Sequence, residues 1–214
     1  MATKPVVGKT TDGPVSRTIN RKISKRITEF ILKKNIPVTP NQVSFISFLL
    51  ALMGSLLYLP RLDPLAGLLV QISSIVDGVD GELARARDQT SPLGAFLDSI
   101  LDRLADAAVV IALTIVSAQT RPLISAVVGS LALLGCLMVS YVHSQGRAAL
   151  KTHVGVTGKV PMFASRDVRL FLVFIASFFY TPLVTLTLLA LITMSYVIAK
   201  TVDTYFQFKV KEVK

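Results

Sequence analysis

The 214-residue sequence is poor in three residue types: it has no tryptophan, one cysteine and two histidines. The single Cys136 excludes an intramolecular disulfide framework. His143 and His153 lack a third ligand at a suitable spacing, which excludes a conventional zinc site. The first residues also lack the short apolar region and cleavage site of a removable signal peptide, so we expect none.

Apolar residues, by contrast, are abundant, and they are concentrated in long runs. Hydrophobic residues make up 52% of the chain, and the formal net charge is +10. A run of about 18 apolar residues or more is long enough to cross a bilayer. On this basis we predict six membrane spans, at 42–59, 64–84, 93–117, 122–144, 169–180 with a polar lead-in from Arg166, and 183–206.

Basic residues are placed asymmetrically around these runs. Clusters of lysine and arginine precede the first span, separate the second from the third and the fourth from the fifth, and end the chain. Each alternate connection holds at most one basic residue. Because cytoplasmic loops carry the excess of lysine and arginine, we predict a multi-pass protein of the cell membrane with both termini in the cytoplasm.

The segment before the first span has a helical pattern of its own. Ile19, Ile23, Ile27, Phe30 and Ile31 recur at spacings of three and four, with basic residues between them. This pattern predicts an amphipathic helix that lies in the membrane interface and contacts lipids. We therefore predict an all-α integral membrane protein, a six-transmembrane-helix bundle with an N-terminal amphipathic interfacial helix. Its parts are a flexible lead (1–15), the amphipathic helix (16–35), the six-helix domain (36–208) and a basic tail (209–214).

Four aspartates flank the predicted turn between the second and third spans. Asp77 and Asp80 are three residues apart, and Asp98 and Asp102 are four apart, so each pair lies on one face of its helix. A turn over 88–92 makes the two helices antiparallel, and the four carboxylates can then converge. Clustered carboxylates inside a membrane protein require a positive counterpart, and oxygen ligands favour hard cations. We predict Mg²⁺, or Mn²⁺, with two ions suited to phosphoryl chemistry.

Small residues accompany these carboxylates. Gly81, Ala84 and Gly94 leave room for a ligand or for close helix approach, although glycine costs helix stability. Arg85, one turn beyond Gly81, is placed to meet a phosphate group.

The spacing of these residues resembles, without a mismatch, the signature of the CDP-alcohol phosphotransferase family. The residues that carry the resemblance are Asp77, Asp80, Gly81, Ala84, Arg85, Gly94, Asp98 and Asp102. The resemblance implies transfer of a phospho-alcohol group from a CDP-alcohol to an acceptor hydroxyl, with release of CMP.

The same resemblance implies a role for each residue. Asp77, Asp80 and Asp98 would hold the metal ions, while Asp102 would assist them or act as the general base. Asp98 and Asp102 are thus the predicted catalytic pair. The remaining signature residues would line the CDP site together with Asp80, and they are Gly81, Ala84, Arg85 and Gly94.

Arginines elsewhere resemble an acceptor site of the family. Arg166 and Arg169 lie where relatives that bind inositol phosphate carry two arginines, although they could also serve only to orient the chain. His143 stands where bacterial relatives carry a basic residue, which is a departure, and Arg147 could substitute for it.

The segment before the first span resembles an archaeal branch of the family. That branch implies CDP-inositol as donor and inositol phosphate as acceptor, but a CDP-diacylglycerol or CDP-archaeol donor explains the sequence equally well. The resemblance also implies a homodimer and a separate cytidylyltransferase, because the branch often carries that enzyme as a fused domain. No nucleic-acid partner is expected.

Two other classes account for some of these features. A magnesium-dependent diphosphate enzyme such as a membrane prenyltransferase also uses paired aspartates, but it does not explain Gly81, Ala84, Arg85 and Gly94. A cation transporter would place ionisable residues at mid-membrane on several spans, whereas here they gather on two spans near one face.

Overall fold

The structure is a computed structural model that describes residues 12–155 and 157–212. Residues 1–11 of the predicted lead (1–15) lie outside the described residues. The regular structure of the described part is helical, and its elements are the π-helix η1 (Ser16–Asn20), α1 (Arg21–Lys33), α2 (Pro40–Leu57), α3 (Asp63–Ala86), α4 (Pro92–Ala118), α5 (Pro122–Leu150), α6 (Arg166–Phe179) and α7 (Pro182–Glu212).

Prolines mark where four of the long helices begin. Proline has no N–H to lose in the first turn of a helix, and its fixed φ suits that position. Pro40, Pro92, Pro122 and Pro182 are the first residues of α2, α4, α5 and α7. Thr39 adds a capping box to α2, since its hydroxyl accepts from the backbone of Gln42, whose side chain accepts from Thr39 in return.

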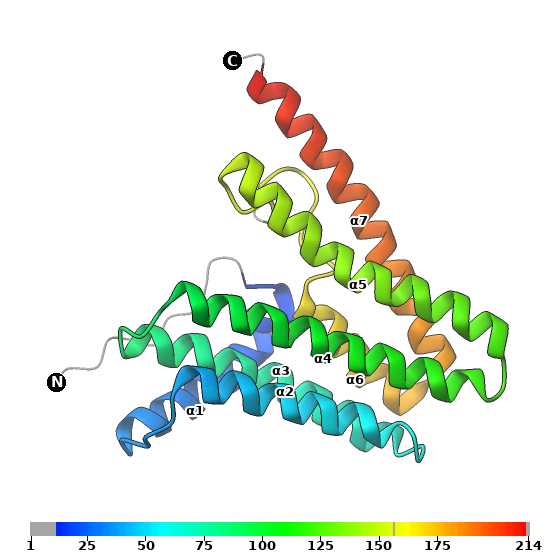
Figure 1. Cartoon of the computed structure of the whole chain (residues 1–214), viewed down its shortest axis with the longest axis horizontal. Coiled ribbons are helices and arrows are strands. Elements are labelled where there is room, and N and C mark those ends of the chain that lie inside the picture. Colours follow the sequence, from blue (N-terminus) through cyan, green and yellow to red (C-terminus); the bar gives the residue numbers. More distant parts are fainter. Residues whose placement is uncertain (1–11, 156, 213–214) are drawn as a thin grey trace.

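The helices form two groups that meet along α4. In the first group, α3 packs against α2, α1 and α6, and α2 also contacts α4. In the second, α5 packs along α7, and both contact α4 (Figure 1). The turn between α3 and α4, with Asp88 at φ 55°, makes these two helices antiparallel as predicted.

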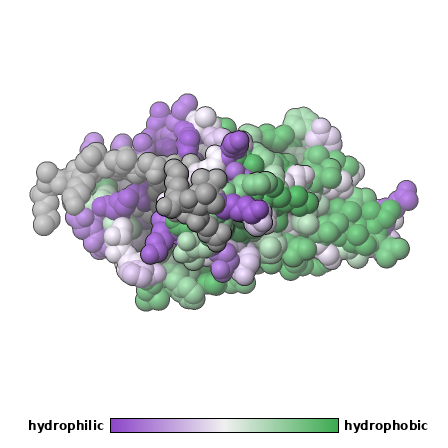
Figure 2. All heavy atoms as spheres, turned by 90° about the horizontal axis from the view of Figure 1, so that it is seen from above, coloured by the Kyte–Doolittle hydropathy of each residue, from purple (hydrophilic) through white to green (hydrophobic). Residues whose placement is uncertain are grey.

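The main core lies where both groups meet, and it contains Val70, Leu113 and Leu186. Tyr58 is fully buried there, and its hydroxyl lies 2.6 Å from the Ser177 hydroxyl. Many large apolar side chains nevertheless face outward, as on α2, α4 and α5. Figure 2 shows apolar surface over one end of the molecule and hydrophilic side chains gathered over the other.

Among the described residues, three helices are long and apolar enough to cross a membrane: Pro40–Leu57, Pro122–Leu150 and Pro182–Lys209. The protein is therefore a multi-pass membrane protein. The six-span count stays a prediction. The helices at the other three predicted spans, α3, α4 and α6, are less apolar or shorter, for different reasons. The aspartates and arginines near the end of α3 and the start of α4 reduce the hydropathy of both, and α6 has 14 residues where a span needs about 20.

The N-terminal helix attaches to the bundle through polar side chains, and its place in the membrane interface stays a prediction. Asn20, Ser24 and Thr28 recur every four residues and are buried, whereas Phe30 is 57% exposed. The Ser24 and Thr28 hydroxyls each donate to the Glu82 carboxylate of α3 at 2.8 Å. A polar stripe, rather than an apolar face alone, therefore attaches this helix to the bundle.

Candidate active site

Three of the four signature aspartates come together. Asp77 of α3 and Asp98 and Asp102 of α4 each offer a carboxylate oxygen, and these oxygens lie within 4.8 Å of one another. The helical spacing places Asp98 and Asp102 one turn apart, and the antiparallel turn brings Asp77 opposite them. These three residues, the carboxylate cluster, form an all-oxygen group that fits a hard divalent cation.

Asp80, the fourth signature aspartate, lies outside the carboxylate cluster. Its carboxylate accepts a hydrogen bond from the Ser44 hydroxyl and contacts the backbone N–H of Gly81. It faces a cavity of about 230 Å³, the smaller cavity, which Asp98 also lines. The predicted nucleotide-site residues Gly81, Ala84, Arg85 and Gly94 all line this cavity.

A cavity of about 430 Å³, the larger cavity, lies on the opposite side of the carboxylate cluster. All three residues of the cluster line it. The predicted acceptor-side residues also line it, and they are His143, Arg147, Arg166 and Arg169. The two cavities therefore meet at Asp98, which lines both.

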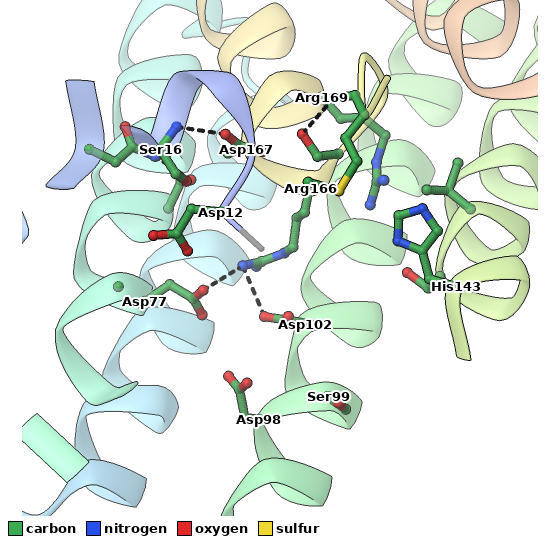
Figure 3. A pocket seen from close by; sticks show the side chains of 18 of the residues that line it. Asp12, Ser16, Asp77, Asp98, Ser99, Asp102, His143, Arg166, Asp167 and Arg169 are labelled. Carbon is green, nitrogen blue, oxygen red and sulfur yellow. Dashed lines mark hydrogen bonds and ion pairs between the residues drawn. The ribbon is translucent and has the colours of Figure 1, made fainter. Parts of the chain in front are cut away.

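Arg166 lies between two carboxylates of the cluster (Figure 3). Its Nη1 is 3.1 Å from Asp77 Oδ2 and 2.9 Å from Asp102 Oδ1. Its Nε is 3.1 Å from Oδ1 of Asp106, which lies one turn beyond Asp102. In the structure Arg166 thus supplies positive charge to the site from the start of α6.

Arg169 is engaged more deeply in the protein. Its side chain is 3% exposed, and its Nη2 lies 2.6 Å from Asp106 Oδ2. Its Nη1 donates to the Ala164 carbonyl at 2.9 Å. These bonds make Arg169 a support for Asp106 and, through Asp106, for Arg166.

The α5 side of the larger cavity carries His143 and Arg147, one turn apart. His143 Nε2 lies 2.6 Å from the Tyr196 hydroxyl of α7, which fixes the ring. His153, in the connection after α5, also lines the cavity. Burial lowers the pKa of His153, and the positive charge of Arg147 lowers it further, so its imidazole is neutral at pH 7. Arg147 is therefore the exposed cation of this wall.

The N-terminal segment forms another wall of the larger cavity. Arg21 holds both oxygens of Asp12 at 2.8 Å and reaches α3 through Glu82 at 2.8 Å and the Gly78 carbonyl at 2.9 Å. Burial alone would lower the pKa of Arg21, but these hydrogen bonds and the two carboxylate charges outweigh it and raise the pKa. Gly78 permits this approach, because a Cβ there would lie 2.8 Å from Arg21 Nη1.

The comparison with protein families shows which family the chain belongs to. The sequence model of the CDP-alcohol phosphatidyltransferase family matches residues 37–203, which include the carboxylate cluster and most of both cavities. The chain belongs to this family. Enzymes of the family are generally dependent on a divalent metal, which agrees with the carboxylate cluster.

Several relatives are similar over much of the chain. A bifunctional IPC transferase and DIPP synthase of Thermococcus kodakarensis is 45% identical over 80% of this chain. This chain spans 39% of the length of that protein, so the match covers less than half of it. An archaetidylinositol phosphate synthase of Pyrococcus horikoshii is 31% identical over 74% of this chain and 79% of its own length.

A solved structure shares the fold. The crystal structure of phosphatidylinositol phosphate synthase from Mycobacterium tuberculosis, with CDP-DAG bound, superposes with a TM-score of 0.68 at 23% identity. The match covers 86% of this chain and 94% of that one. The helical arrangement of Figure 1 is therefore a known fold.

Sequence reasoning missed two parts of this site. Asp106 continues the four-residue spacing of Asp98 and Asp102, and this periodicity was a signal that could have found it. Asp12 and Arg21 carry no comparable signal, because they reach the site only through packing of the N-terminal segment on α3.

Proposed function

We propose that this protein is a membrane-embedded CDP-alcohol phosphotransferase that uses inositol phosphate as acceptor. The donor we favour is CDP-inositol, because the chain is similar in sequence, at 45% and 46% identity, to relatives named bifunctional IPC transferase and DIPP synthase. The alternative donor is CDP-archaeol or CDP-diacylglycerol, favoured by the similarity to the archaetidylinositol phosphate synthase. In both cases the reaction joins the alcohol phosphate to an acceptor hydroxyl and releases CMP.

The main support for this proposal is the pair of cavities that share Asp98 as a lining residue. Transfer between two substrates needs both of them held in line at one point. The smaller cavity offers small residues and Arg85 to a nucleotide diphosphate, and the larger cavity offers Arg147 and polar groups to a phosphorylated alcohol. The carboxylate cluster stands between the two.

The bond changes follow from this arrangement. An oxygen of the acceptor hydroxyl forms a bond to the phosphorus that carries the donor alcohol, and the bond from that phosphorus to CMP breaks. Asp102 accepts the hydroxyl proton, because it faces the larger cavity at the meeting point. Arg166 lowers the repulsion between Asp77 and Asp102 and orients both carboxylates.

Asp77, Asp98 and Asp102 would hold a divalent cation, Mg²⁺ or Mn²⁺, and Asp80 would complete the set for a second ion from the smaller cavity. When bound, the metal supplies the positive charge that the donor diphosphate and the attacking hydroxyl need. Asp80 is thus the predicted metal ligand that lies on the side of the smaller cavity, where the nucleotide would bind.

We infer that all six helices α2–α7 cross the membrane, with the carboxylate cluster near the cytoplasmic face. Support comes from the gathering of hydrophilic side chains over one end of the molecule (Figure 2). The positive-inside pattern places both termini at this same end. Ile23 and Phe30, which α1 leaves exposed, would face the lipid interface. The homodimer and a separate cytidylyltransferase remain predictions.

The first experiment measures CMP release by purified protein in detergent with Mg²⁺ and inositol 1-phosphate. CDP-inositol and a CDP-archaeol are compared as donors. Release from CDP-inositol supports the favoured reaction, and release from the lipid donor alone supports the alternative. Absence of release with both donors would contradict the proposed acceptor.

A variant pair tests whether the cluster carries the reaction. Asp102→Asn should abolish most CMP release, while Asp63→Asn should retain it. Asp63 also pairs with an arginine, Arg61, at 3.1 Å, but it lies at the start of α3, at the opposite end of this helix from the cluster. Equal activity of both variants would refute the role of Asp102 as base.

A further inference from the structure

We propose that the N-terminal segment Asp12–Ser24 binds the hydroxyl groups of the acceptor and so selects a polyol phosphate. This inference rests on the proposed function and adds a recognition site to it. The residues of this segment that line the larger cavity are Asp12, Gly13, Ser16, Asn20, Arg21 and Ser24. Hereafter this set is the polyol wall.

The polyol wall is built into the bundle at two points. Arg21 joins Asp12 to the carbonyl of Gly78, the neighbour of Asp77 in the carboxylate cluster. The backbone N–H of Ser16 donates to Asp167 Oδ2 at 2.6 Å, and Asp167 is the neighbour of Arg166. Both anchors are therefore one residue away from a charged group of the site.

A close backbone approach supports the same geometry. A Cβ on Gly13 would overlap the Asp167 carboxylate, so this segment can lie against α6 because the residue is glycine. Asn20 is 3% exposed, donates to the Ser74 hydroxyl at 3.1 Å and accepts from Gln71 at 2.8 Å. The wall is thus held in place by directed hydrogen bonds on α3 and α6.

The two sides of the larger cavity differ in charge. On the side of α3, Asp12 and Ser16 present carboxylate and hydroxyl oxygens, and His143 stands on the side of α5 (Figure 3). The cation Arg147 also lines the cavity from α5, one turn after His143. A phosphate group is attracted to Arg147, whereas the opposite charges of Asp12 and Arg21 offset each other on the other side. Hydroxyl groups, in contrast, donate hydrogen bonds to carboxylates, and each carboxylate oxygen can accept more than one.

This charge difference orients an acceptor that has a phosphate at one end and several hydroxyls at the other. The phosphate would meet Arg147, and the hydroxyls would meet the polyol wall beside Asp77. A hydroxyl is then brought to the carboxylate cluster, where the transfer takes place. The chemistry that fits the cavity is accordingly a polyol phosphate rather than a phosphate with an apolar substituent.

The position of the wall in the sequence agrees with a role in selectivity. The family model begins at residue 37, so it includes the carboxylate cluster but not the polyol wall. A segment outside the region common to the family can differ between members without any change in the shared transfer chemistry. We therefore assign the acceptor selectivity of this protein to the polyol wall, which lies outside the signature shared by the family.

Asp12→Asn tests the inference, with Asp63→Asn as the matched loss of a carboxylate that pairs with an arginine elsewhere. We expect the KM for inositol 1-phosphate to rise about tenfold in Asp12→Asn, the effect of one lost charged hydrogen bond. The KM for the CDP-alcohol and kcat should stay within about twofold, since the carboxylate cluster is intact. Asp63→Asn should change none of the three constants.

Asn20→Ala is a second variant that leaves the Asp12–Arg21 pair in place, and thermal unfolding in detergent verifies that both variants fold. A KM for inositol 1-phosphate unchanged in both variants would overturn the inference. A fall in kcat with unchanged KM would also overturn it, because that result indicates a structural role. If wild-type protein releases no CMP, the proposed function fails, and calorimetric binding of inositol 1-phosphate to wild type and Asp12→Asn then decides the inference separately.

Discussion

The two cavities beside Asp98 are built in different ways. The smaller cavity is lined by residues from Pro40 to Asp98, which belong to α2, α3, α4 and the turn between the last two. The larger cavity takes its walls from the N-terminal segment, α3, α4, α5, α6 and the connection before α6. The smaller cavity is formed by three helices that follow one another in the sequence. The larger cavity depends on the packing of segments that are distant in the sequence.

Charge is also used differently in the two cavities. Around the larger cavity, arginines and aspartates bond to one another, as Arg166 and Arg169 do with Asp106. The smaller cavity contains glycine and alanine at the positions that face the ligand space. The larger cavity is therefore held open by ion pairs, and the smaller cavity is held open by the absence of large side chains.

The largest expected effect follows from breaking the buried ion pair of the larger cavity. Arg169→Met leaves the buried Asp106 with Arg166 as its remaining arginine partner, and removal of one partner of a buried ion pair costs about 3–5 kcal/mol. We expect a large decrease in the midpoint of thermal unfolding, measured in detergent. The acceptor site should be lost with it, because Arg166 shares the same aspartate.

A double variant separates the charge effect from lost packing. Arg169→Met with Asp106→Leu removes both charges, and apolar replacement of a whole buried pair is often neutral or stabilising. Its unfolding midpoint should therefore lie above that of Arg169→Met. If the double variant is less stable than Arg169→Met, the ion pair is not what holds this side together.

The next largest effect concerns the residue that both cavities share. Asp98→Asn should lower kcat at least about 100-fold, since loss of a metal ligand costs more than the 10–100-fold typical of outer-shell partners. Binding of Mn²⁺, followed by electron paramagnetic resonance, should weaken in parallel. Asp63→Asn should behave as wild type in both measurements. Tight Mn²⁺ binding by Asp98→Asn would show that the carboxylate cluster is not the metal site.

The difference between the cavities also explains what the sequence could predict. Residues of the smaller cavity such as Gly81, Ala84 and Gly94 lie close together in the chain, so helical spacing and one turn were sufficient to group them. Of the four carboxylates predicted to converge, Asp77, Asp98 and Asp102 do so for the same reason, whereas Asp80 lies outside this group. Helix starts at proline likewise depend on local chemistry alone.

The rest of the site could not be predicted because it depends on packing between distant segments. The bond from Arg21 to Glu82 joins residues 61 positions apart, and that from Arg169 to Asp106 joins residues 63 apart. Periodicity within one helix contains no information on such pairs. The polar stripe of Asn20, Ser24 and Thr28 reads as a solvated face until Glu82 is known to lie against it.

A moderate effect is expected from filling the smaller cavity. Ala84→Leu adds a side chain where a nucleotide would lie, and a loss of about 1.4 kcal/mol of binding raises the KM for the CDP-alcohol about tenfold. The KM for inositol 1-phosphate should not change. Ala126→Leu, at an exposed position of α5, is the matched control. If Ala84→Leu changes the acceptor KM instead, the assignment of the two cavities is reversed.

The smallest effect is expected from the exposed cation of the larger cavity. Arg147→Gln removes a positive charge that bonds the acceptor phosphate in competition with water, so the KM for inositol 1-phosphate should rise about fivefold. The increase should be greatest at low ionic strength, because salt screens exposed charges. Lys159→Gln removes an exposed charge that does not line the cavity, and its KM should be that of wild type at every salt concentration. An Arg147→Gln enzyme with the wild-type KM and salt dependence would mean that the acceptor phosphate is held instead by Arg166, displaced from the aspartates it contacts in the structure.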